Sequence, residues 1–195
     1  MRAIVCREYG PPENLVAEDL PPPGPPKSGE VNVTVYAVGM NFHDLLAVEG
    51  RSQTQVKPPF TPGAELAGVV SAVGRGVDHV RVGDRVLASN SLGSCVEEFS
   101  CPAACVFPIP DEMDFASAAS FFIGGTTSRY ALMDRARLQP GETLLVLGAG
   151  SGVGQTAIEI GKILGARVIA AGSSDEKLAL AKARGADVTY KYPRG

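Results

Sequence analysis

Apolar and polar positions alternate in short runs along the first 110 or so residues, and turn residues separate the runs. The clearest run spans residues 29–39, where Val31, Val33 and Val35 alternate with more polar side chains. A period of two residues is that of a β-strand with one buried face. Further short strands are predicted at residues 66–74, 84–89, 94–100 and 105–110. Many short strands with few helical stretches predict a small, β-rich, barrel-like domain.

The pattern changes near Asp114, which is a candidate N-cap for the first of two helices predicted at residues 114–122 and 127–138. After a turn at residues 139–142, residues 143–148 form a continuous apolar run, typical of a strand buried in a parallel sheet. The segments that follow alternate: helix 152–164, strand 166–172, helix 173–185 and strand 186–190. This β-α-β-α-β order is half of a doubly wound sheet.

The helix predicted at residues 152–164 has apolar side chains at helical spacing, and Gly165 follows it as a stop signal. We expect its buried face to comprise Val153, Ala157, Ile160 and Leu164.

Composition narrows the class of protein. The chain has 195 residues, 45% hydrophobic and 20% charged, and a formal net charge of −3. These values are ordinary for a globular protein and favour neither a nucleic-acid nor an anionic-membrane partner. Residues 1–10 lack the apolar core of a signal peptide, and no apolar run reaches membrane-span length. We therefore expect a soluble, cytoplasmic protein.

The cysteines and histidines offer no metal site. Cys6, Cys95, Cys101 and Cys105 lack paired C-x-x-C spacing, and residues 100–107 have the pattern strand, turn, strand. We expect isolated, partly buried thiols. His43 and His79 are expected to be surface or packing residues.

The stretch VLGAGSGVG carries the strongest chemical signal, because four alternating glycines lie between a predicted strand and a predicted helix. Such glycines let the backbone turn sharply and approach a pyrophosphate, whose charge then faces the N–H groups of the helix N-terminus. A glycine-rich turn that serves packing alone is the other interpretation. The cofactor-binding residues predicted in this turn are Gly148, Ala149, Gly150, Ser151, Gly152, Val153 and Gly154.

The end of the second strand bears on which dinucleotide binds. NAD sites place an acid there to bond the ribose hydroxyls, whereas this chain has Gly172 followed by Ser173. Ser173, Ser174 and Lys177 offer hydroxyl donors and a cation, which suit a 2′-phosphate and favour NADPH. Ser173 also has capping-box spacing with Glu176, so it is alternatively, or additionally, a helix cap.

Several longer motifs resemble those of a known family. They include AVGMNFHDLLAVEGR, PPFTPGAELAGVVSAVGRGV and ARVIAAGSSDEKLALAKARGAD, and they run in family order along the whole chain. Together they resemble the medium-chain dehydrogenase/reductase superfamily, in its zinc-independent quinone oxidoreductase, or zeta-crystallin-like, branch. The resemblance implies a GroES-like barrel over residues 1–112, connecting helices over 113–138 and the first half of a Rossmann domain over 139–195.

The resemblance also implies roles for individual residues. Asn41 and Asp44 would line the substrate and nicotinamide side of the cleft as catalytic residues, and Asn41 would also contact the cofactor. Thr127 would bond the nicotinamide region, and Tyr192 would lie beside the adenosine. Asn41 as the cap of a turn and Thr127 as an ordinary helix residue are the structural alternatives.

Four positions depart from patterns seen in relatives. Zinc enzymes of the superfamily have cysteine and histidine where this chain has Asn41 and Ala64, so a catalytic zinc is not expected. Ser151 stands where many relatives have glycine. Ser52 stands where relatives often have a tyrosine near the substrate.

The implied activity is NADPH-dependent hydride transfer to a quinone or a conjugated enone, with an enoyl or alkenal reductase as a near alternative. The partners expected are this small-molecule substrate and a second copy of the chain in a homodimer. Superfamily members are considerably longer and contain a second Rossmann half. A catalytically inactive, truncated nucleotide-binding or interaction fragment is therefore the alternative from another functional class.

Overall fold

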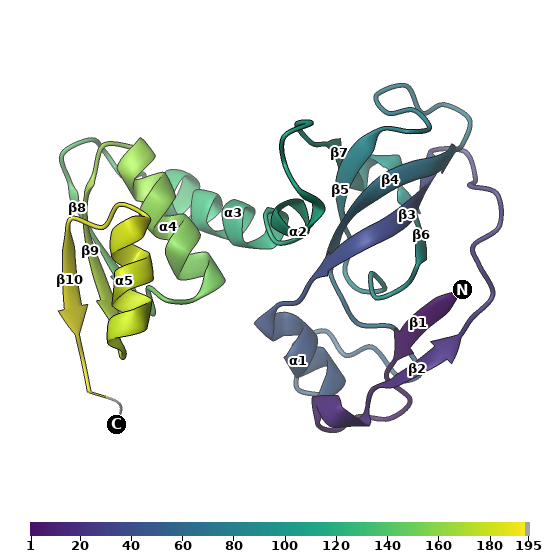
Figure 1. Cartoon of the computed structure of the whole chain (residues 1–195), viewed down its shortest axis with the longest axis horizontal. Coiled ribbons are helices and arrows are strands. Elements are labelled where there is room, and N and C mark those ends of the chain that lie inside the picture. The colour runs from purple at the N-terminus through teal and green to yellow at the C-terminus, as the bar shows by residue number, and fades with distance from the viewer. Residues whose placement is uncertain (194–195) are drawn as a thin grey trace. The chain divides into compact units, whose positions relative to one another are not determined.

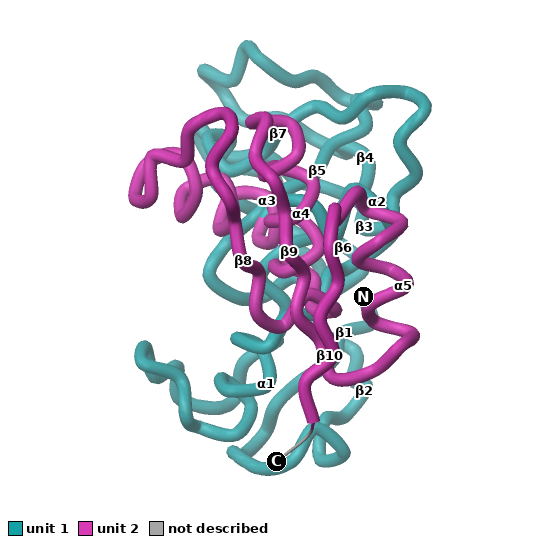
Figure 2. The backbone as a smooth tube through the Cα atoms, turned by 90° about the vertical axis from the view of Figure 1, so that its left-hand side faces the viewer, with its two compact units in different colours: residues 1–122 teal, residues 123–195 magenta. Residues whose placement is uncertain are grey.

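The computed structural model describes residues 1–193, and the chain divides into two compact units. Unit 1 is Met1–Phe122 and unit 2 begins at Ile123 (Figure 2). Each unit has a hydrophobic core of its own, so each is described separately.

Unit 1 is built on an antiparallel sheet of order β6-β3-β4-β5-β7 (Figure 1). Its strands are β3 (Glu30–Gly39), β4 (Glu65–Val73), β5 (Arg85–Ser89), β6 (Glu98–Pro102) and β7 (Val106–Pro108). The predicted β-rich character of this part of the chain is confirmed. On β3, Val31 and Val33 are fully buried, as the alternation predicts, and they pack with Leu66, Val70 and Val86 in the core.

One predicted strand, residues 94–100, is displaced toward the C-terminus. Only Glu98–Pro102 pair with β3 as a regular strand. Cys95, earlier in the predicted strand, bonds elsewhere: its amide donates to the Pro62 carbonyl, and its carbonyl accepts from the Ile4 amide. Alternation alone does not show which neighbour a strand-like segment pairs with.

Several elements of unit 1 were not predicted. These are the hairpin β1 (Arg2–Val5) and β2 (Val16–Asp19), the helix α1 (Phe42–Val48), and the 3₁₀ turn η1 (Pro12–Asn14). A second 3₁₀ turn, η2 (Ala103–Cys105), lies between β6 and β7, where the sequence predicts a turn. α1 has seven residues, too few for its apolar spacing to stand out in the sequence.

The helices after residue 114 follow the prediction in kind. α2 (Phe115–Ala119) begins after Asp114, whose carboxylate accepts a hydrogen bond from the Ser117 amide at 2.8 Å, so the predicted N-cap is confirmed. α3 (Phe122–Arg129) begins earlier than predicted and continues into a π-helical segment, η3 (Tyr130–Arg135).

Unit 2 contains the predicted β-α-β-α-β order. Its elements are β8 (Thr143–Leu147), α4 (Gly152–Ile163), β9 (Arg167–Gly172), α5 (Asp175–Ala183) and β10 (Val188–Lys191). The strands are parallel, in the order β10-β9-β8, and α4 and α5 lie on one face of the sheet (Figure 1). Gly165, at φ +80°, follows the last turn of α4 as predicted.

The buried face of α4 differs from the prediction. Gly154, Ile158 and Gly161 are buried, whereas Val153 is 42% exposed. The reason is close packing: a β-carbon at position 161 would lie 2.7 Å from Leu144 Cδ2, and one at position 154 would lie 2.4 Å from the Gly148 carbonyl oxygen. The face of α4 that packs on the sheet is therefore formed partly by glycines. A search for apolar side chains at helical spacing does not detect such a face.

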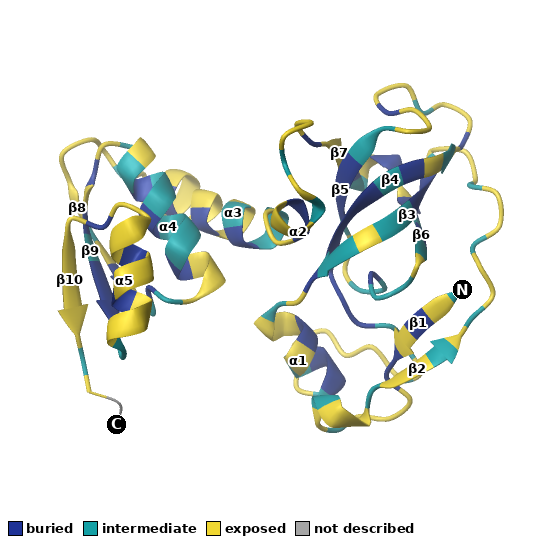
Figure 3. Cartoon of the chain, in the orientation of Figure 1, coloured by how far each residue is buried: buried dark blue, intermediate teal, exposed yellow. Residues whose placement is uncertain are grey.

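β8 is less buried than its apolar sequence predicts. Val146 faces the helices and is buried, but Leu145 is 56% exposed and Leu147 is 72% exposed. Within residues 1–193, β8 pairs with β9 alone and is an edge strand. The central strand β9 is well buried, whereas β10 is exposed (Figure 3).

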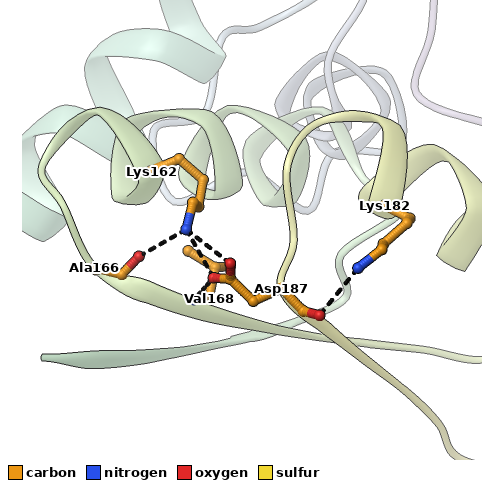
Figure 4. Close-up of polar contacts among 5 residues, drawn as sticks. All are labelled: Lys162, Ala166, Val168, Lys182 and Asp187. Carbon is orange, nitrogen blue, oxygen red and sulfur yellow. Dashed lines mark hydrogen bonds and ion pairs between the residues drawn. The ribbon is translucent and has the colours of Figure 1, made fainter. Parts of the chain in front are cut away.

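A polar network ties the helices to the ends of the strands in unit 2 (Figure 4). The Lys162 ammonium donates to both carboxylate oxygens of Asp187 at 2.9 and 2.8 Å and to the Ala166 carbonyl at 3.2 Å. Asp187 also accepts from the Val168 amide at 2.7 Å, and its carbonyl accepts from Lys182. These bonds hold the pKa of the Asp187 carboxyl below its usual range, with Lys162 as the largest cause.

Because α4 approaches β8 closely, alanine substitutions at two glycines of the same turn should have different effects on the free energy of unfolding. Gly154→Ala should lower the free energy of unfolding by about 1–3 kcal/mol, because the added β-carbon meets backbone atoms. Gly152→Ala is the matched control, since its β-carbon would have nothing within 4 Å. Urea unfolding of both variants measures the difference, and equal stabilities would contradict it.

The Asp187 network predicts a pH-dependent contribution to stability. A carboxyl whose pKa is lowered by folding stabilises the fold above its unfolded pKa of about 3.9, and that contribution is lost as the pH falls through the folded pKa. Asp187→Asn should therefore lower the melting temperature at pH 7, with a gap from wild type that narrows toward about pH 3. Asp175→Asn, on a carboxylate whose side chain is 84% exposed, is the control. A gap independent of pH would refute this role.

Candidate functional site

The glycine-rich turn joins the end of β8 to the start of α4. Gly148 adopts φ +67°, a left-handed conformation that glycine reaches without strain. Ser151 is the N-cap of α4: its hydroxyl accepts from the Gly154 amide at 3.1 Å and donates to the Gly148 carbonyl at 2.9 Å. The serine that departs from the glycine of many relatives therefore closes the turn itself.

Gly154 brings the first turn of α4 against the strand end, as its contact with Gly148 shows. Ala149 is fully buried and its amide donates to the Ala171 carbonyl of β9 at 3.1 Å, whereas Gly152 and Val153 are exposed at the helix start. The N–H groups of the first helical turn have no partner within a helix, so an anion at this end finds both donors and the positive end of the helix dipole.

A cavity of about 140 Å³ lies beside this turn. Its lining residues are Gly148, Gly150, Ser151, Gly172, Ser173, Lys177 and Tyr192. Six of the seven were predicted as cofactor-binding residues from the sequence. Gly172 was predicted as the end of the strand but not as a lining residue.

The second turn, between β9 and α5, corrects one structural alternative. α5 begins at Asp175, and its N-cap is Ser174, whose hydroxyl accepts from the Lys177 amide at 3.4 Å. The capping box of Ser173 with Glu176 is therefore wrong by one residue. Ser173 lies before the cap and lines the cavity instead.

Lys177 crosses from α5 to the glycine-rich turn. A β-carbon at Gly150 would lie 2.6 Å from Lys177 Cγ, so the aliphatic stem of the lysine passes directly over this glycine. Among the described residues that line the cavity, Lys177 supplies the charge, and no acid is present. Of the two acids between Ser173 and Lys177 along the chain, Asp175 forms an ion pair with Lys191 at 2.6 Å.

Tyr192 and Thr127 have different positions. The Tyr192 amide donates to the Gly172 carbonyl at 3.1 Å, which fixes this residue beside the cavity that it lines. Thr127 is exposed on α3 and does not line the cavity. Its predicted contact with a nicotinamide stays a prediction.

In unit 1, Asn41 and Asp44 lie at the start of α1 with a third residue that the sequence analysis missed. Asp44 is fully buried, and its carboxylate accepts from the amides of Asn41 at 2.7 Å and Gly63 at 3.1 Å. The Asn41 side-chain nitrogen donates to the carboxylate of Glu65 at 2.9 Å, and Glu65 is 2% exposed. The sequence signal for Glu65 is a single acid inside the apolar run AELAGVV.

The remaining polar groups near Asn41 do not form a metal site. His43 Nε2 lies 3.4 Å from the hydroxyl of Ser52, a residue that is 8% exposed. Burial, and to a lesser degree the Asp44 carboxylate, raises the pKa of the Cys95 thiol to about 11. The cysteines are free thiols, as predicted. Residues 1–193 hold no cluster of three or more His, Cys, Asp or Glu side chains suited to a metal, and independence from zinc stays a prediction.

None of the helices in the described part of the chain combines the length and the apolar character needed to cross a lipid bilayer.

Comparisons with known proteins agree with both units. Residues 27–142 match the alcohol dehydrogenase GroES-like domain family, and residues 152–194 match a family described as zinc-binding dehydrogenase. Quinone oxidoreductase-like protein 2 of Bos taurus is 39% identical over 195 residues, which are 100% of this chain and 55% of that protein. The chain thus spans about half the length of this relative.

Solved structures show the same fold. A probable oxidoreductase from Mycobacterium abscessus has a TM-score of 0.93 and 37% identity, and the match covers 100% of this chain and 62% of that one. The quinone oxidoreductase from Thermus thermophilus, described alone and in complex with NADPH, has a TM-score of 0.87 and 36% identity, with 98% and 60% covered. The predicted fold class, a GroES-like β-rich domain followed by a partial Rossmann fold, is confirmed. The chain belongs to the medium-chain dehydrogenase/reductase superfamily, and its relatives include quinone oxidoreductases.

Proposed function

We propose that this chain binds NADPH in unit 2 and acts as an oxidoreductase, which transfers a hydride from NADPH to a quinone or a conjugated enone. The cavity beside the two turns of unit 2 carries the proposal, because it joins a glycine-rich turn, a helix N-terminus, a serine and a lysine. The NADPH complex of the Thermus thermophilus relative supports this cofactor.

The first turn suits the pyrophosphate of the cofactor. Gly148 and Gly150 leave the backbone open to close approach, and α4, twelve residues long, points its N-terminus at this turn. Main-chain N–H groups and the helix dipole stabilise phosphate charge there. Ser151 and Gly154 hold the turn in shape by their hydrogen bond.

The second turn favours a 2′-phosphate over a free 2′-hydroxyl. Ser173 is not needed as a helix cap, so its hydroxyl is available as a donor, and Lys177 brings a cation to the same cavity. A carboxylate, which would bond the ribose hydroxyls of NAD and repel a phosphate, is missing from the lining residues in the described chain. Charge-assisted bonds to phosphate are stronger than neutral ones.

NADPH, when bound, supplies the hydride from nicotinamide C4, and the acceptor takes one proton to complete the two-electron reduction. The residues of this chain bind and orient the reactants. In the proposal Asn41 faces the reacting groups, and Asp44, which is fully buried and bonded to two main-chain amides, holds Asn41 and the loop at residue 63 in place. Tyr192 lies beside the adenosine and Thr127 beside the nicotinamide. The proton comes from water.

A second candidate is a nucleotide-binding chain without catalysis. Two observations favour it: the parallel sheet of unit 2 has three strands among the described residues, and the chain spans 55% of the bovine relative. Titration of NADPH by cofactor fluorescence, followed by addition of a quinone while absorbance is monitored at the nicotinamide band, separates the two. Oxidation of the cofactor supports the enzyme, and binding without oxidation supports the second candidate.

Substitution of Lys177 tests the choice of cofactor. Lys177→Ala should weaken NADPH binding by about tenfold or more, as expected for loss of a charge-assisted bond, and leave NADH binding nearly unchanged. Lys182→Ala, on the last turn of the same helix, removes the same charge away from the cavity and serves as the control. Calorimetric titration measures all three proteins, and equal losses for both cofactors would remove the argument for a 2′-phosphate.

The two neighbouring serines should separate binding from stability. Ser174→Ala should lower the free energy of unfolding by about 1 kcal/mol, because it removes the N-cap of α5. Ser173→Ala should leave stability nearly unchanged and weaken NADPH binding. Thermal unfolding and NADPH titration of each variant provide the comparison. The assignment fails if Ser173→Ala is the destabilising change.

A further inference from the structure

The side chain of Asn41 is held from two sides. Its nitrogen donates to Oε1 of Glu65 at 2.9 Å. On the other side, Asn41 and Asp44 form a reciprocal capping box at the start of α1, in which the Asn41 side chain receives the Asp44 amide and the Asp44 carboxylate receives the Asn41 amide. The amide group of Asn41 is therefore fixed with its nitrogen toward Glu65 and its oxygen toward α1.

Glu65 is set in a rigid part of the sheet. It is the first residue of β4 and pairs with Gly39 of β3 on one side and Ser89 of β5 on the other. Its side chain lies over Gly39, where a β-carbon would be 2.8 Å from Glu65 Oε1 and 2.1 Å from the Ala119 carbonyl oxygen. The buried carboxylate thus depends on a glycine at position 39 and has little freedom to turn.

The hydrogen-bonding capacity of Asn41 then leaves one group for a ligand. A primary amide has one oxygen and two N–H donors. The capping box engages the oxygen and Glu65 takes one N–H. Within residues 1–193 the second N–H has no protein acceptor, and Asn41 itself is partly exposed. Position 41 is therefore a hydrogen-bond donor.

We propose that Glu65 is a positioning residue that aims the second N–H of Asn41 at a carbonyl oxygen of the bound reactants. This inference rests on the proposed function and names the chemistry that Asn41 recognises: the carbonyl oxygen of a quinone or enone, or that of the nicotinamide carboxamide. A fixed donor at the acceptor carbonyl stabilises the negative charge that develops on the oxygen as the hydride adds.

An exchange of polarity between the two residues tests the proposal. Asn41→Asp removes both donors and sets a carboxylate against Glu65, so the melting temperature and kcat/KM for quinone should both fall, the latter on the order of 100-fold. Glu65→Gln retains one acceptor oxygen for Asn41 but replaces the other with an N–H group in a buried site, so both quantities should fall, by less than in Asn41→Asp. In the double variant, the amide introduced at position 65 can donate to the carboxylate introduced at position 41 and remake the bridge, but position 41 still has no proton to give.

The double variant should therefore recover the melting temperature while kcat/KM for quinone or the Kd for NADPH stays impaired. A raised quinone KM or lowered kcat assigns the bond to the acceptor, and a raised NADPH Kd assigns it to the carboxamide. Asn14→Asp, an exposed position of unit 1, controls for the added charge. Adenosine 2′,5′-bisphosphate, which lacks the nicotinamide, should bind all variants equally.

Recovery of both stability and ligand parameters in the double variant would overturn the inference, because Asn41 would then be purely structural. If the wild-type chain binds NADPH without turnover, the NADPH Kd alone decides, and an unchanged Kd in the double variant overturns the inference. If the wild-type chain binds neither NADPH nor the bisphosphate, the proposed function fails first, and the inference fails with it.

Discussion

The packing of α4 against the end of β8 is the contact on which the candidate cofactor site depends. A β-carbon at Gly154 would lie 2.4 Å from the carbonyl oxygen of Gly148, so the helix reaches the strand only because no side chain is present. That approach sets the N-terminus of α4 beside the cavity, which Gly148 and Gly150 help to line. Ser151 then closes the turn by bonding to both of its ends. Anion binding at such a turn follows from main-chain geometry.

In the proposed function, the first turn binds the pyrophosphate, and the second turn selects a cofactor with a phosphorylated ribose. β9 ends at Gly172, Ser174 takes the capping position, and Ser173 and Lys177 are left facing the cavity. A shift of the helix start by one residue would exchange the roles of the two serines. Selectivity for a phosphorylated ribose is therefore connected to where α5 begins. In unit 1, too, structural hydrogen bonds determine which group is left for a ligand. The buried carboxylates of Asp44 and Glu65 accept from the main-chain and side-chain nitrogens of Asn41, and one side-chain N–H remains.

The sequence predicts the elements of unit 2 well, because each strong signal there is local: an apolar run for β8, glycines at both ends of α4 and a serine pair before α5. Prediction from the sequence fails where contacts between residues far apart in the chain determine the structure. The buried face of α4 runs through Gly154 and Gly161, which apolar periodicity ignores. α1 and the β1–β2 hairpin are short, and their partners lie far along the chain. Most of the cavity residues were foreseen, but Glu65 was not, because its role appears only when β4 is placed beside Asn41.

In the proposed function, unit 2 recognises the 2′-phosphate of the cofactor. The most direct measurement is calorimetric titration of the wild-type chain with adenosine 2′,5′-bisphosphate and, separately, with ADP. These ligands test the adenosine side of the site without any need for hydride transfer. The wild-type chain should bind the bisphosphate at least about tenfold more tightly than ADP, with a preference that weakens as the salt concentration is raised. Equal affinities, or tighter binding of ADP, would contradict it.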